Sequence, residues 1–437
     1  MGATASAALP ARVPIRVELA RIGATMWQVV VGLVKLLVHR PRGRSLPVRA
    51  AIEAREVFTR LGPTYVKFGQ IIASSPGVFP EVLSSEFRTL LDRVPPADPA
   101  RVRALIAEDL GAPPEQVFAT FDATPLASAS IAQVHRATLH SGEQVVVKIQ
   151  RPGITQRLGA DLQILRRVAW LAEKSVYGRM LNASEVIVDF ADNVGAELDF
   201  AREAASMEEW FAGLADTAYA ARVRVPRIHW AQTTARVLTM EYVAGTRIDD
   251  LAALEKAGRE GKQLVKTILF SLLESALRRG LFHGDLHAGN ILVDGDGRIV
   301  LLDFGIVGRF DPPTRDLMRQ LIVDLLVRND FEAVSRTFYR LGAVGKPMAS
   351  SREAAEEIDR LTAPLKGTAL SNLSFGTIGK TLIDFAKIHD AKIPRDLVLV
   401  GKQLLYVERY MKLLAPAWEP IGDLELLVYV GGLATRN

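Results

Sequence analysis

Residues 283–305 read HGDLHAGNILVDGDGRIVLLDFG and are the most informative segment of the chain. Asp285 is followed by Asn290 five residues on and by Asp303 eighteen residues on. The segments ILVD and RIVLLD, separated by GDG, predict a β-hairpin that returns Asp303 beside Asp285. Phosphoryl transfer needs a carboxylate that orients or deprotonates the acceptor, and oxygen ligands that hold Mg²⁺ on the phosphates. The spacing therefore predicts Asp285 and Asn290 as catalytic residues and Asn290 and Asp303 as metal ligands.

A zinc site is the alternative for the same stretch. His283, Asp285 and His287 stand at alternate positions, and histidine and carboxylate side chains are zinc ligands. This alternative leaves Asn290 and Asp303 without a role, so we favour phosphoryl transfer.

A second chemical signal lies upstream, in the segment QVVVKIQ at 144–150. This segment and AQVHRATL, joined by the turn HSGE, predict a β-hairpin. Lys148 ends an apolar run, and a lysine directed into a core is costly unless it is paired. Kinases require a strand lysine on the α- and β-phosphates that a helix glutamate holds. Lys148 is therefore a candidate for both catalysis and nucleotide binding.

Three carboxylates are available to pair with Lys148. A long helix predicted over 184–213 carries Glu197, Asp199 and Glu203, and the last two would lie four residues apart on one face. We expect Glu203 to pair with Lys148. A solvated acidic face on a surface helix is the alternative explanation of these carboxylates.

The segment LTMEYVAGT at 238–246 ends a predicted strand with an apolar residue, an acid and a small turn. A hinge between two lobes that offers backbone groups to adenine would have this pattern. Glu241 and Val243 are therefore candidates for cofactor binding.

Together these motifs resemble the UbiB/AarF/ADCK-type atypical kinases, a branch of the protein-kinase-like fold, over residues 46–330. Three further segments carry the resemblance. LGPTYVKFGQ contains the family's KxGQ, ELD its ExD, and PLASASIAQVH stands where the family has an alanine-rich nucleotide loop. The resemblance implies ATP and Mg²⁺ as cofactors, and it implies that nucleotide is bound by Ala127, Ser128, Ala129 and Ser130.

In this family the KxGQ helix lies over the active site, and its lysine meets the ExD acids. Lys67 and Gln70 are three residues apart on one helical face, and Gly69 lets that face approach another backbone closely. By this resemblance we expect Lys67 to contact Glu197 and Asp199 where a peptide substrate would otherwise bind. These residues and Gln70 would then control substrate access. An ordinary surface helix is the alternative for KFGQ alone.

The sequence departs from the family pattern in several places. It has HGDLHAGN where the family commonly has HADPHPGN, which is closer to small-molecule phosphotransferases, and Ala132 replaces a usual glycine. After Asp303 the chain reaches a predicted helix at Pro312 with no APE-type activation segment. Phosphate transfer to a peptide is therefore not expected. Nor does the sequence show the C-terminal hydrophobic span that some relatives have.

The order of predicted elements indicates an α+β, two-lobed, protein-kinase-like fold. We expect a basic amphipathic arm at 1–45, a helical extension with KxGQ at 46–120, an N-lobe of β-sheet and inserted helices at 121–244, and a mostly helical C-lobe at 245–437. The C-lobe would hold the catalytic and metal-binding loops.

Positive charge is concentrated in the arm. The 437-residue chain has a net charge of +5, yet its first 60 residues hold ten Lys/Arg against three acids. No charge falls between Arg21 and Lys35, and Arg40, Arg42 and Arg44 follow. On a helical period one face is apolar (Trp27, Val30, Val31, Val34, Leu37, Val38), and the other holds Thr25, Gln28, Gly32, Lys35 and His39. Such a helix suits either an anionic membrane surface or docking on the protein's own core.

Composition excludes several other classes of protein. The chain has no cysteine, which excludes disulfides, thiolate nucleophiles and cysteine-ligated metals. The high hydrophobic content excludes wholesale disorder. No stretch reaches the roughly 18 uninterrupted apolar residues typical of a membrane span. No small-residue cleavage site precedes the basic run, so a secretory signal is not expected.

We therefore expect a Mg²⁺- and ATP-dependent atypical kinase or ATPase that is cytoplasmic or peripheral at the inner face of the membrane. The expected partners are nucleotide, an anionic membrane surface and, by family resemblance alone, a quinone-like lipid; nucleic acid is not expected. Two alternatives remain: a small-molecule kinase that phosphorylates a hydroxylated metabolite, and a scaffold that binds nucleotide without catalysis. The sequence does not specify the phosphate acceptor or the oligomeric state.

Overall fold

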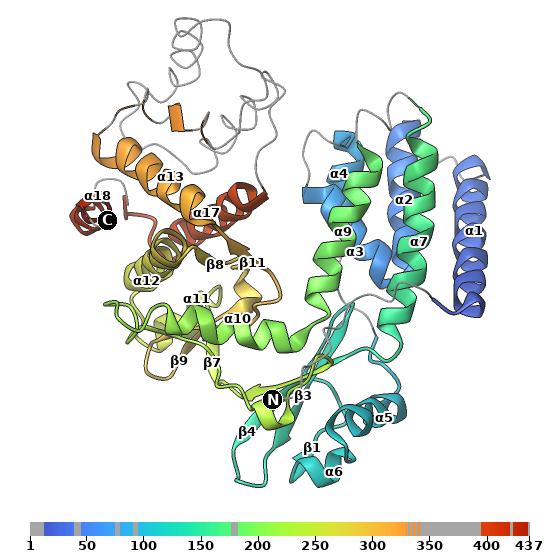
Figure 1. The fold of residues 1–437 in the computed structure, drawn as a ribbon, viewed down its shortest axis with the longest axis horizontal. Coiled ribbons are helices and arrows are strands. Elements are labelled where there is room, and N and C mark those ends of the chain that lie inside the picture. Colours follow the sequence, from blue (N-terminus) through green and yellow to red (C-terminus); the bar gives the residue numbers. More distant parts are fainter. Residues whose placement is uncertain are drawn as a thin grey trace, which may run out of the picture. The chain divides into compact units, whose positions relative to one another are not determined.

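The computed structural model describes residues 13–38, 45–74, 79–90, 95–175, 182–328, 395–419 and 423–435, together with residues 330, 333, 336, 337 and 340 (Figure 1). The chain divides into two compact units. The first comprises Met1–Ala204 and Arg227–Tyr242, and the second comprises Ala205–Pro226 and Val243–Asn437. Residues 205–226 thus belong to the second unit, although they fall inside the range predicted for the N-lobe.

A five-stranded antiparallel sheet lies in the first unit. Its strands are β1 (Thr120–Phe121), β2 (Ala127–Ser128), β3 (Ala132–Thr138), β4 (Gln144–Gln150) and β6 (Val237–Glu241). Val145, Val147 and Ile149 alternate along β4 and pack into a core with Ile106 of α5 (Pro99–Leu110). Because side chains alternate along a strand, Lys148 is directed to the opposite face of the sheet.

The described part of the first unit has further helices besides α5. They are α1 (Ile15–Val38), α2 (Leu46–Leu61), α3 (Pro63–Ser74), α4 (Glu81–Phe87), the short α6 (Pro114–Val117), α7 (Ile154–Ala172) and α9 (Ala183–Glu197). Helices α2, α3 and α4 pack on one another through Phe58, Phe68 and Phe87, while α1 lies against α2 and α7 (Figure 1). The basic residues Arg40, Arg42 and Arg44 lie outside the described residues.

The helix predicted over 184–213 is broken in two. Helix α9 ends at Glu197 and α10 (Phe200–Ala212) begins three residues later. The Oδ1 of Asp199 accepts a hydrogen bond from the backbone N–H of Arg202 at 3.1 Å. Aspartate is a strong helix N-cap because its carboxylate satisfies a free N–H of the first turn. Asp199 therefore caps a new helix, and Glu203 lies in the first turn of that helix.

The described residues of the second unit form two small sheets. One has the order β5 (Val223–Arg224), β10 (Ile299–Leu301), β9 (Ile291–Asp294) and β7 (Gly245–Arg247), and the other pairs β8 (Leu281–His283) with β11 (Val307–Arg309). The predicted hairpin is therefore present as β9 and β10. Strand β5 ends at Arg224, and Pro226 two residues later lacks the N–H that a strand interior requires.

Helices make up most of the rest of the second unit where the structure describes it. They are α11 (Leu251–Lys256), α12 (Gly261–Glu274), α13 (Pro312–Val323), α17 (Arg395–Leu414) and α18 (Leu424–Thr435), with π-helical turns at Ser275–Arg279 and Asp324–Arg328. Buried α12 packs against α17. The fold is α+β, as predicted.

Candidate active site

The second unit brings together the three residues predicted from the HGD…DFG stretch. Strand β8 ends at His283, and the N–H of Gly284 donates to the carbonyl of Ile306 at 2.9 Å. The amide Nδ2 of Asn290 donates to the carbonyl of Asp285 at 3.0 Å. Across the β9–β10 hairpin, the N–H of Leu302 donates to the carbonyl of Asn290 at 3.0 Å. Hydrogen bonds thus link Asp285 to Asn290, and Asn290 to Leu302, the residue before Asp303.

Glycine is required beside Asp285. A Cβ on Gly284 would lie 2.6 Å from the side chain and 2.8 Å from the carbonyl oxygen of Ile306. Real Cβ atoms do not come so close, so only glycine lets these two segments approach. The Oδ1 of Asp303 accepts from the N–H of Gly305 at 2.9 Å, which fixes that carboxylate at the start of the returning segment.

His283 supports the loop from inside the protein. Its ring is buried against Phe304, with centroids 4.6 Å apart, and its Nδ1 accepts from the N–H of Asp285 at 3.0 Å. Burial lowers the pKa of His283 to about 4, against the opposing effect of the nearby Asp285 and Asp303 charges. A neutral imidazole that accepts at Nδ1 is a structural part of the loop.

The donor set suits magnesium better than zinc. Among the described residues, no three His, Asp or Glu side chains gather closely enough to hold a metal ion. Protein Mg²⁺ sites need no such cage, because one or two oxygen ligands and the substrate phosphates complete the coordination. The amide oxygen of Asn290 and the carboxylate of Asp303 are hard donors of this kind. These two residues fit Mg²⁺, and the zinc alternative gains no support.

Helix α17 contacts this loop in a way that the sequence did not predict. The Nζ of Lys402 donates to Oδ1 of Asp285 at 2.8 Å. The buried amide of Gln403 donates to the carbonyl of Gly284 at 2.7 Å and accepts from the N–H of Leu286 at 2.8 Å. The hydroxyl of Tyr410 donates to the carbonyl of Leu286 at 2.7 Å. The signal in the sequence was that Lys402 and Gln403 interrupt the apolar run LVLVGKQLLYV at 397–407.

In the first unit, Lys148 pairs with Glu203. The Nζ of Lys148 lies 2.8 and 2.9 Å from the two carboxylate oxygens, and the side chains are 13% and 2% exposed. The N-cap of Asp199 sets where α10 starts and so places Glu203 in its first turn. The Phe200 ring lies 5.1 Å from the Lys148 ammonium. The pairing expected from the sequence is present.

The alanine-rich segment is a tight turn held by an arginine. The N–H of Ala129 donates to the carbonyl of Ala132 at 2.9 Å, closing the turn between β2 and β3. Arg151 donates from Nε to the carbonyl of Ala129 and from Nη2 to Oγ of Ser128, each at 2.7 Å. Ser130 is fully buried. Ala127, Ser128, Ala129 and Ser130 therefore form a braced turn, and their contact with nucleotide stays a prediction.

The KxGQ helix meets the ExD motif within the first unit. The Nζ of Lys67 lies 2.7 Å from Oε2 of Glu197, while Asp199 caps α10 as described above. Gln70 lies one turn after Lys67 on α3. A Cβ on Gly69 would lie 2.4 Å from a side-chain atom of Leu90. Gly69 therefore makes room for the Leu90 side chain, whereas close approach of another backbone was expected.

The two predicted hinge residues, Glu241 and Val243, lie on either side of the boundary between the first and second units in the sequence. Glu241 ends β6, and its backbone N–H donates to the carbonyl of Arg227 at 2.9 Å. Val243 is buried and is the first residue of the segment that belongs to the second unit. Their contact with adenine stays a prediction.

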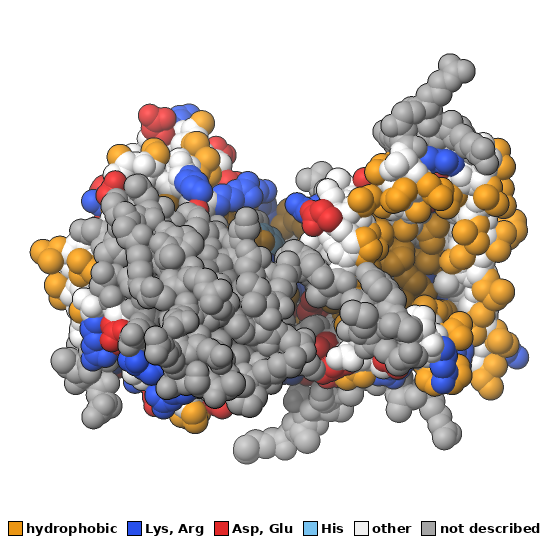
Figure 2. Space-filling view, turned by 90° about the horizontal axis from the view of Figure 1, so that it is seen from above, with side chains coloured by type: hydrophobic (Ala, Val, Ile, Leu, Met, Phe, Trp, Pro, Cys, Tyr) orange, Lys and Arg blue, Asp and Glu red, His pale blue; other side chains and the backbone are white. Residues whose placement is uncertain are grey.

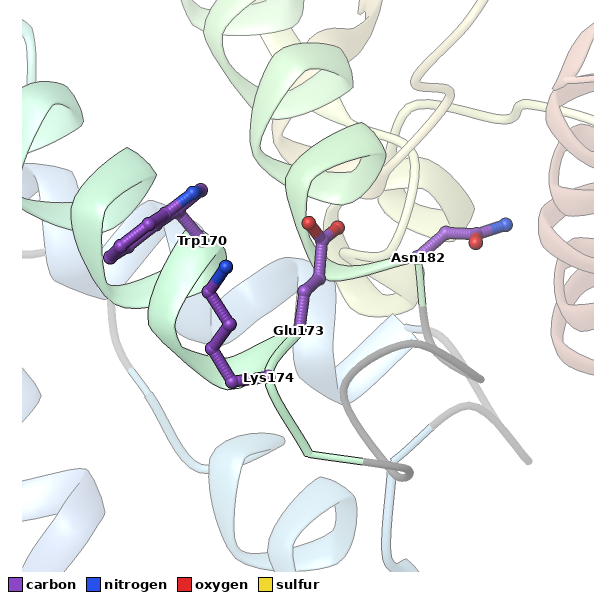
Figure 3. Close-up of a pocket in the computed structure, with 4 residues that line it drawn as sticks. All are labelled: Trp170, Glu173, Lys174 and Asn182. Atoms are coloured by element: carbon purple, nitrogen blue, oxygen red, sulfur yellow. The ribbon is translucent and has the colours of Figure 1, made fainter.

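A surface pocket at the end of α7 lies apart from these residues in the sequence. Trp170, Glu173, Lys174 and Asn182 line it (Figure 3). The ammonium of Lys174 lies 4.4 Å from the centre of the Trp170 ring. None of the residues predicted for phosphoryl transfer lines this pocket.

Comparisons with known proteins place the chain in a family. Residues 89–338 match the family model of the ABC1 atypical kinase-like domain, and residues 358–419 match that of the UbiB helical domain. An uncharacterized protein of Mycobacterium tuberculosis is 54% identical over 418 residues, which cover 96% of this chain and 86% of that protein. The probable protein kinase UbiB of Marinobacter nauticus is 35% identical over 368 residues, 83% of this chain and 66% of that protein.

A solved structure is similar in fold. It is the complex of Rv3197 with erythromycin from Mycobacterium tuberculosis, with a TM-score of 0.50 and 24% identity over 82% of this chain and 94% of that chain. Since the first family model spans more than half of the sequence, the protein belongs to the ABC1 atypical kinase-like family and has its kinase-like α+β fold.

Proposed function

We propose that the protein is a Mg²⁺- and ATP-dependent phosphotransferase or ATPase of the UbiB type that works at an anionic membrane surface. The observation that carries the proposal is the buried pair of Lys148 and Glu203, at 2.8 Å. A kinase is competent only when its strand lysine is held by a helix glutamate and its metal-binding aspartate is in place. A role in isoprenoid-quinone or lipid metabolism follows from the family resemblance alone.

Each residue has a distinct part in the reaction. Lys148 binds the α- and β-phosphates, and Asn290 and Asp303 hold Mg²⁺, which neutralises phosphate charge when bound. Asp285 orients the acceptor hydroxyl or water and accepts its proton. The acceptor oxygen forms a bond to the γ-phosphorus as the bond to the bridging oxygen breaks, and ADP leaves with that electron pair.

Two substitutions test the assignment. Asp303→Asn should abolish the Mg²⁺-dependent rise in melting temperature on adding ATP, because it removes the charged metal ligand. Asp285→Asn should keep that rise and lose ATP turnover. An undiminished shift in the first variant would remove Asp303 as a metal ligand. Retained turnover in the second would remove Asp285 from the mechanism, and a wild type that binds ATP without turnover would favour the scaffold.

A small acceptor is favoured over a peptide. After Gly305 the chain forms β11, which pairs with β8, and α13 begins at Pro312. No long activation segment lies between them to serve as a platform for a peptide. A screen of hydroxylated metabolites and of phenols that resemble quinone precursors, with radiolabelled ATP, separates a small-molecule kinase from an ATPase.

The arrangement of α1 supports membrane contact. Its polar side faces the bundle: Arg21 binds Asp161 of α7, Thr25 lies 3.2 Å from the hydroxyl of Tyr65, and Gln28 accepts from Arg60 at 2.8 Å. Its apolar side faces outward, with Trp27 65% exposed. Figure 2 shows hydrophobic side chains along the edge of the molecule that α1 forms. Helix α1 therefore packs on the protein itself, which was one of the two alternatives given by the sequence, but it does so through its polar face.

Helix α1 is also long and apolar enough to cross a membrane, by length and composition alone. Because its polar contacts hold it against α2 and α7, we infer that it lies in the plane of the membrane surface. Trp170 and Leu171 of α7 are exposed near the start of α1, where Arg167 of α7 binds Glu18. Tryptophan beside lysine, as in the pair of Trp170 with Lys174, is typical of an interfacial position.

Vesicle binding tests this part of the proposal. The triple change Trp27→Ser, Val34→Ser and Leu37→Ser should weaken binding to vesicles of equal phosphatidylglycerol and phosphatidylcholine by about tenfold or more. The matched control removes two exposed apolar side chains of α18, with Leu424→Ser and Val428→Ser. Equal binding of wild type and triple variant would assign the exposed face of α1 to another partner.

A further inference from the structure

Lys402 of α17 forms an ion pair with the carboxylate that we place beside the acceptor. Its Nζ lies 2.8 Å from Oδ1 of Asp285, and the two side chains are 40% and 25% exposed. An ammonium group has three donors, and Asp285 uses one. The pair is open enough to solvent for a ligand to reach the same nitrogen.

Anchoring of α17 does not depend on this pair. Gln403 and Tyr410 are buried, and their hydrogen bonds to the backbone of Gly284 and Leu286 already fasten the helix to the loop. A partly exposed ion pair contributes at most about 1 kcal/mol to stability. The side chain of Lys402 is therefore placed by its neighbours and is not needed to hold them.

The catalytic loop has no strong cation of its own. No lysine or arginine occurs between His283 and Gly297. Arg298 comes next, and it is engaged by Asp294 at 3.0 Å and Asp296 at 2.7 Å. Transfer of a phosphoryl group spreads negative charge over its oxygens, and enzymes meet that charge with a lysine, an arginine or a metal ion. Helix α17 supplies the ammonium that this loop lacks.

We propose that Lys402 is a catalytic residue that binds the phosphoryl group during its transfer to the acceptor held by Asp285. This inference rests on the proposed phosphotransferase or ATPase function. Before transfer Lys402 holds the Asp285 carboxylate, and during transfer its other N–H groups donate to the phosphoryl oxygens. The acceptor proton passes to Asp285, the γ-phosphorus leaves the bridging oxygen of ADP, and Lys402 keeps its protons throughout.

ATP turnover of Lys402→Met tests the inference. We expect kcat to fall about 100-fold with KM and melting temperature nearly unchanged, because the lost interaction forms mainly in the transition state. Lys402→Arg should recover part of the rate, since it restores a cation. The matched control is Lys412→Met on the same helix, whose partner is Glu408, and it should leave kcat unchanged. An unchanged or increased kcat in Lys402→Met, or a loss that follows a fall in melting temperature, would overturn the inference.

A binding measurement separates this inference from the proposed function. Wild-type protein with ADP and Mg²⁺ should melt higher when aluminium fluoride, a mimic of the transferred phosphoryl group, is added. Lys402→Met should lose that increment and keep the response to ADP and Mg²⁺ alone. Equal increments in both proteins would overturn the role of Lys402 while leaving the proposed function intact. No increment in the wild type would overturn the proposed function and the inference with it.

Discussion

Helices α3 and α17 each place a lysine on a carboxylate, yet they are fastened to their surroundings in different ways. Lys67 of α3 lies 2.7 Å from Glu197 in the first unit, and Lys402 of α17 lies 2.8 Å from Asp285 in the second. Gln403 and Tyr410 of α17 bind the backbone of the loop at Gly284 and Leu286. Helix α3 is instead held by side chains of neighbouring helices.

The difference follows from what each helix packs against. A loop has backbone N–H and C=O groups that no regular structure pairs, so a helix that covers it must supply polar side chains. A neighbouring helix satisfies its own backbone and offers only side chains. We therefore expect damage to the anchor of α17 to change the chemistry, and damage to the anchor of α3 to change mainly the stability.

The largest effect is expected from Gln403→Leu. The change leaves the N–H of Leu286 and the carbonyl of Gly284 buried without their partner, at about 1–3 kcal/mol each. The free energy of unfolding should fall by about 4 kcal/mol, and kcat by about 100-fold or more, because the loop that carries Asp285 is displaced. Urea unfolding and ATP turnover measure the two effects.

The matched control for this variant is Gln320→Leu, the same change at an exposed position of α13. It should alter neither stability nor rate. A Gln403→Leu protein that loses stability but keeps its rate would show that α17 only holds the unit together.

The anchor of α3 gives the next largest effect. Arg21 lies 2.6 Å from Asp161, which is fully buried and also accepts from Thr64 at the start of α3. Arg21→Met would leave this carboxylate with one hydroxyl partner, so the free energy of unfolding should fall by about 3 kcal/mol. Turnover per folded molecule should stay unchanged. Arg60→Met, which removes an exposed contact to the same α1, is the control and should cost less than about 1 kcal/mol.

The pH dependence of stability probes the loop under α17. His283 has a pKa lowered to about 4, so as the pH falls below 6.5 the unfolded chain takes up its proton before the folded protein does. The stability that His283 contributes is present above pH 6.5 and is lost toward pH 4. From pH 7 to pH 5 the loss should be about 2 kcal/mol. Protonation at Nδ1 would also end its hydrogen bond from the N–H of Asp285.

The variant His283→Gln isolates this contribution. Burial also lowers the pKa values of His135 and His229, which add to the slope of the wild type in the same direction. The difference between the two pH profiles therefore reports on His283 alone. Parallel profiles between pH 7 and pH 5 would contradict the assignment.

Sequence patterns predicted the parts of the site that local chemistry determines. The spacing of Asp285 and Asp303 on either side of a turn implies that a hairpin brings Asp303 back beside Asp285, and the hairpin β9–β10 is present. A strand lysine requires a partner, and Glu203 is the one found. The kinase-like α+β fold followed from the same motifs and is confirmed by the family match.

The rest depends on contacts that no local pattern encodes. The N-cap at Asp199 competes with a continuous helix, and nothing in the periodicity shows which of the two forms. The contact of Lys402 with Asp285 joins residues 117 positions apart. Helix α1 buries its polar face because Asp161 and other polar partners lie in the helices that it packs against. An amphipathic helix usually buries its apolar face, so this arrangement is the reverse.

The smallest effect is expected from Lys67→Met. This variant is the α3 counterpart of Lys402→Met in α17, so the two together compare the helices directly. The pair of Lys67 with Glu197 is partly exposed, so its loss should cost about 1 kcal/mol or less. The affinity for ATP should stay within about twofold of wild type, because the pair of Lys148 and Glu203 is separate and remains intact. Isothermal titration with Mg²⁺ and ATP measures the affinity, and Lys35→Met, at a more exposed pair with Glu56, is the control. A tenfold loss of ATP affinity in Lys67→Met alone would show that α3, like α17, acts on the chemistry of the site.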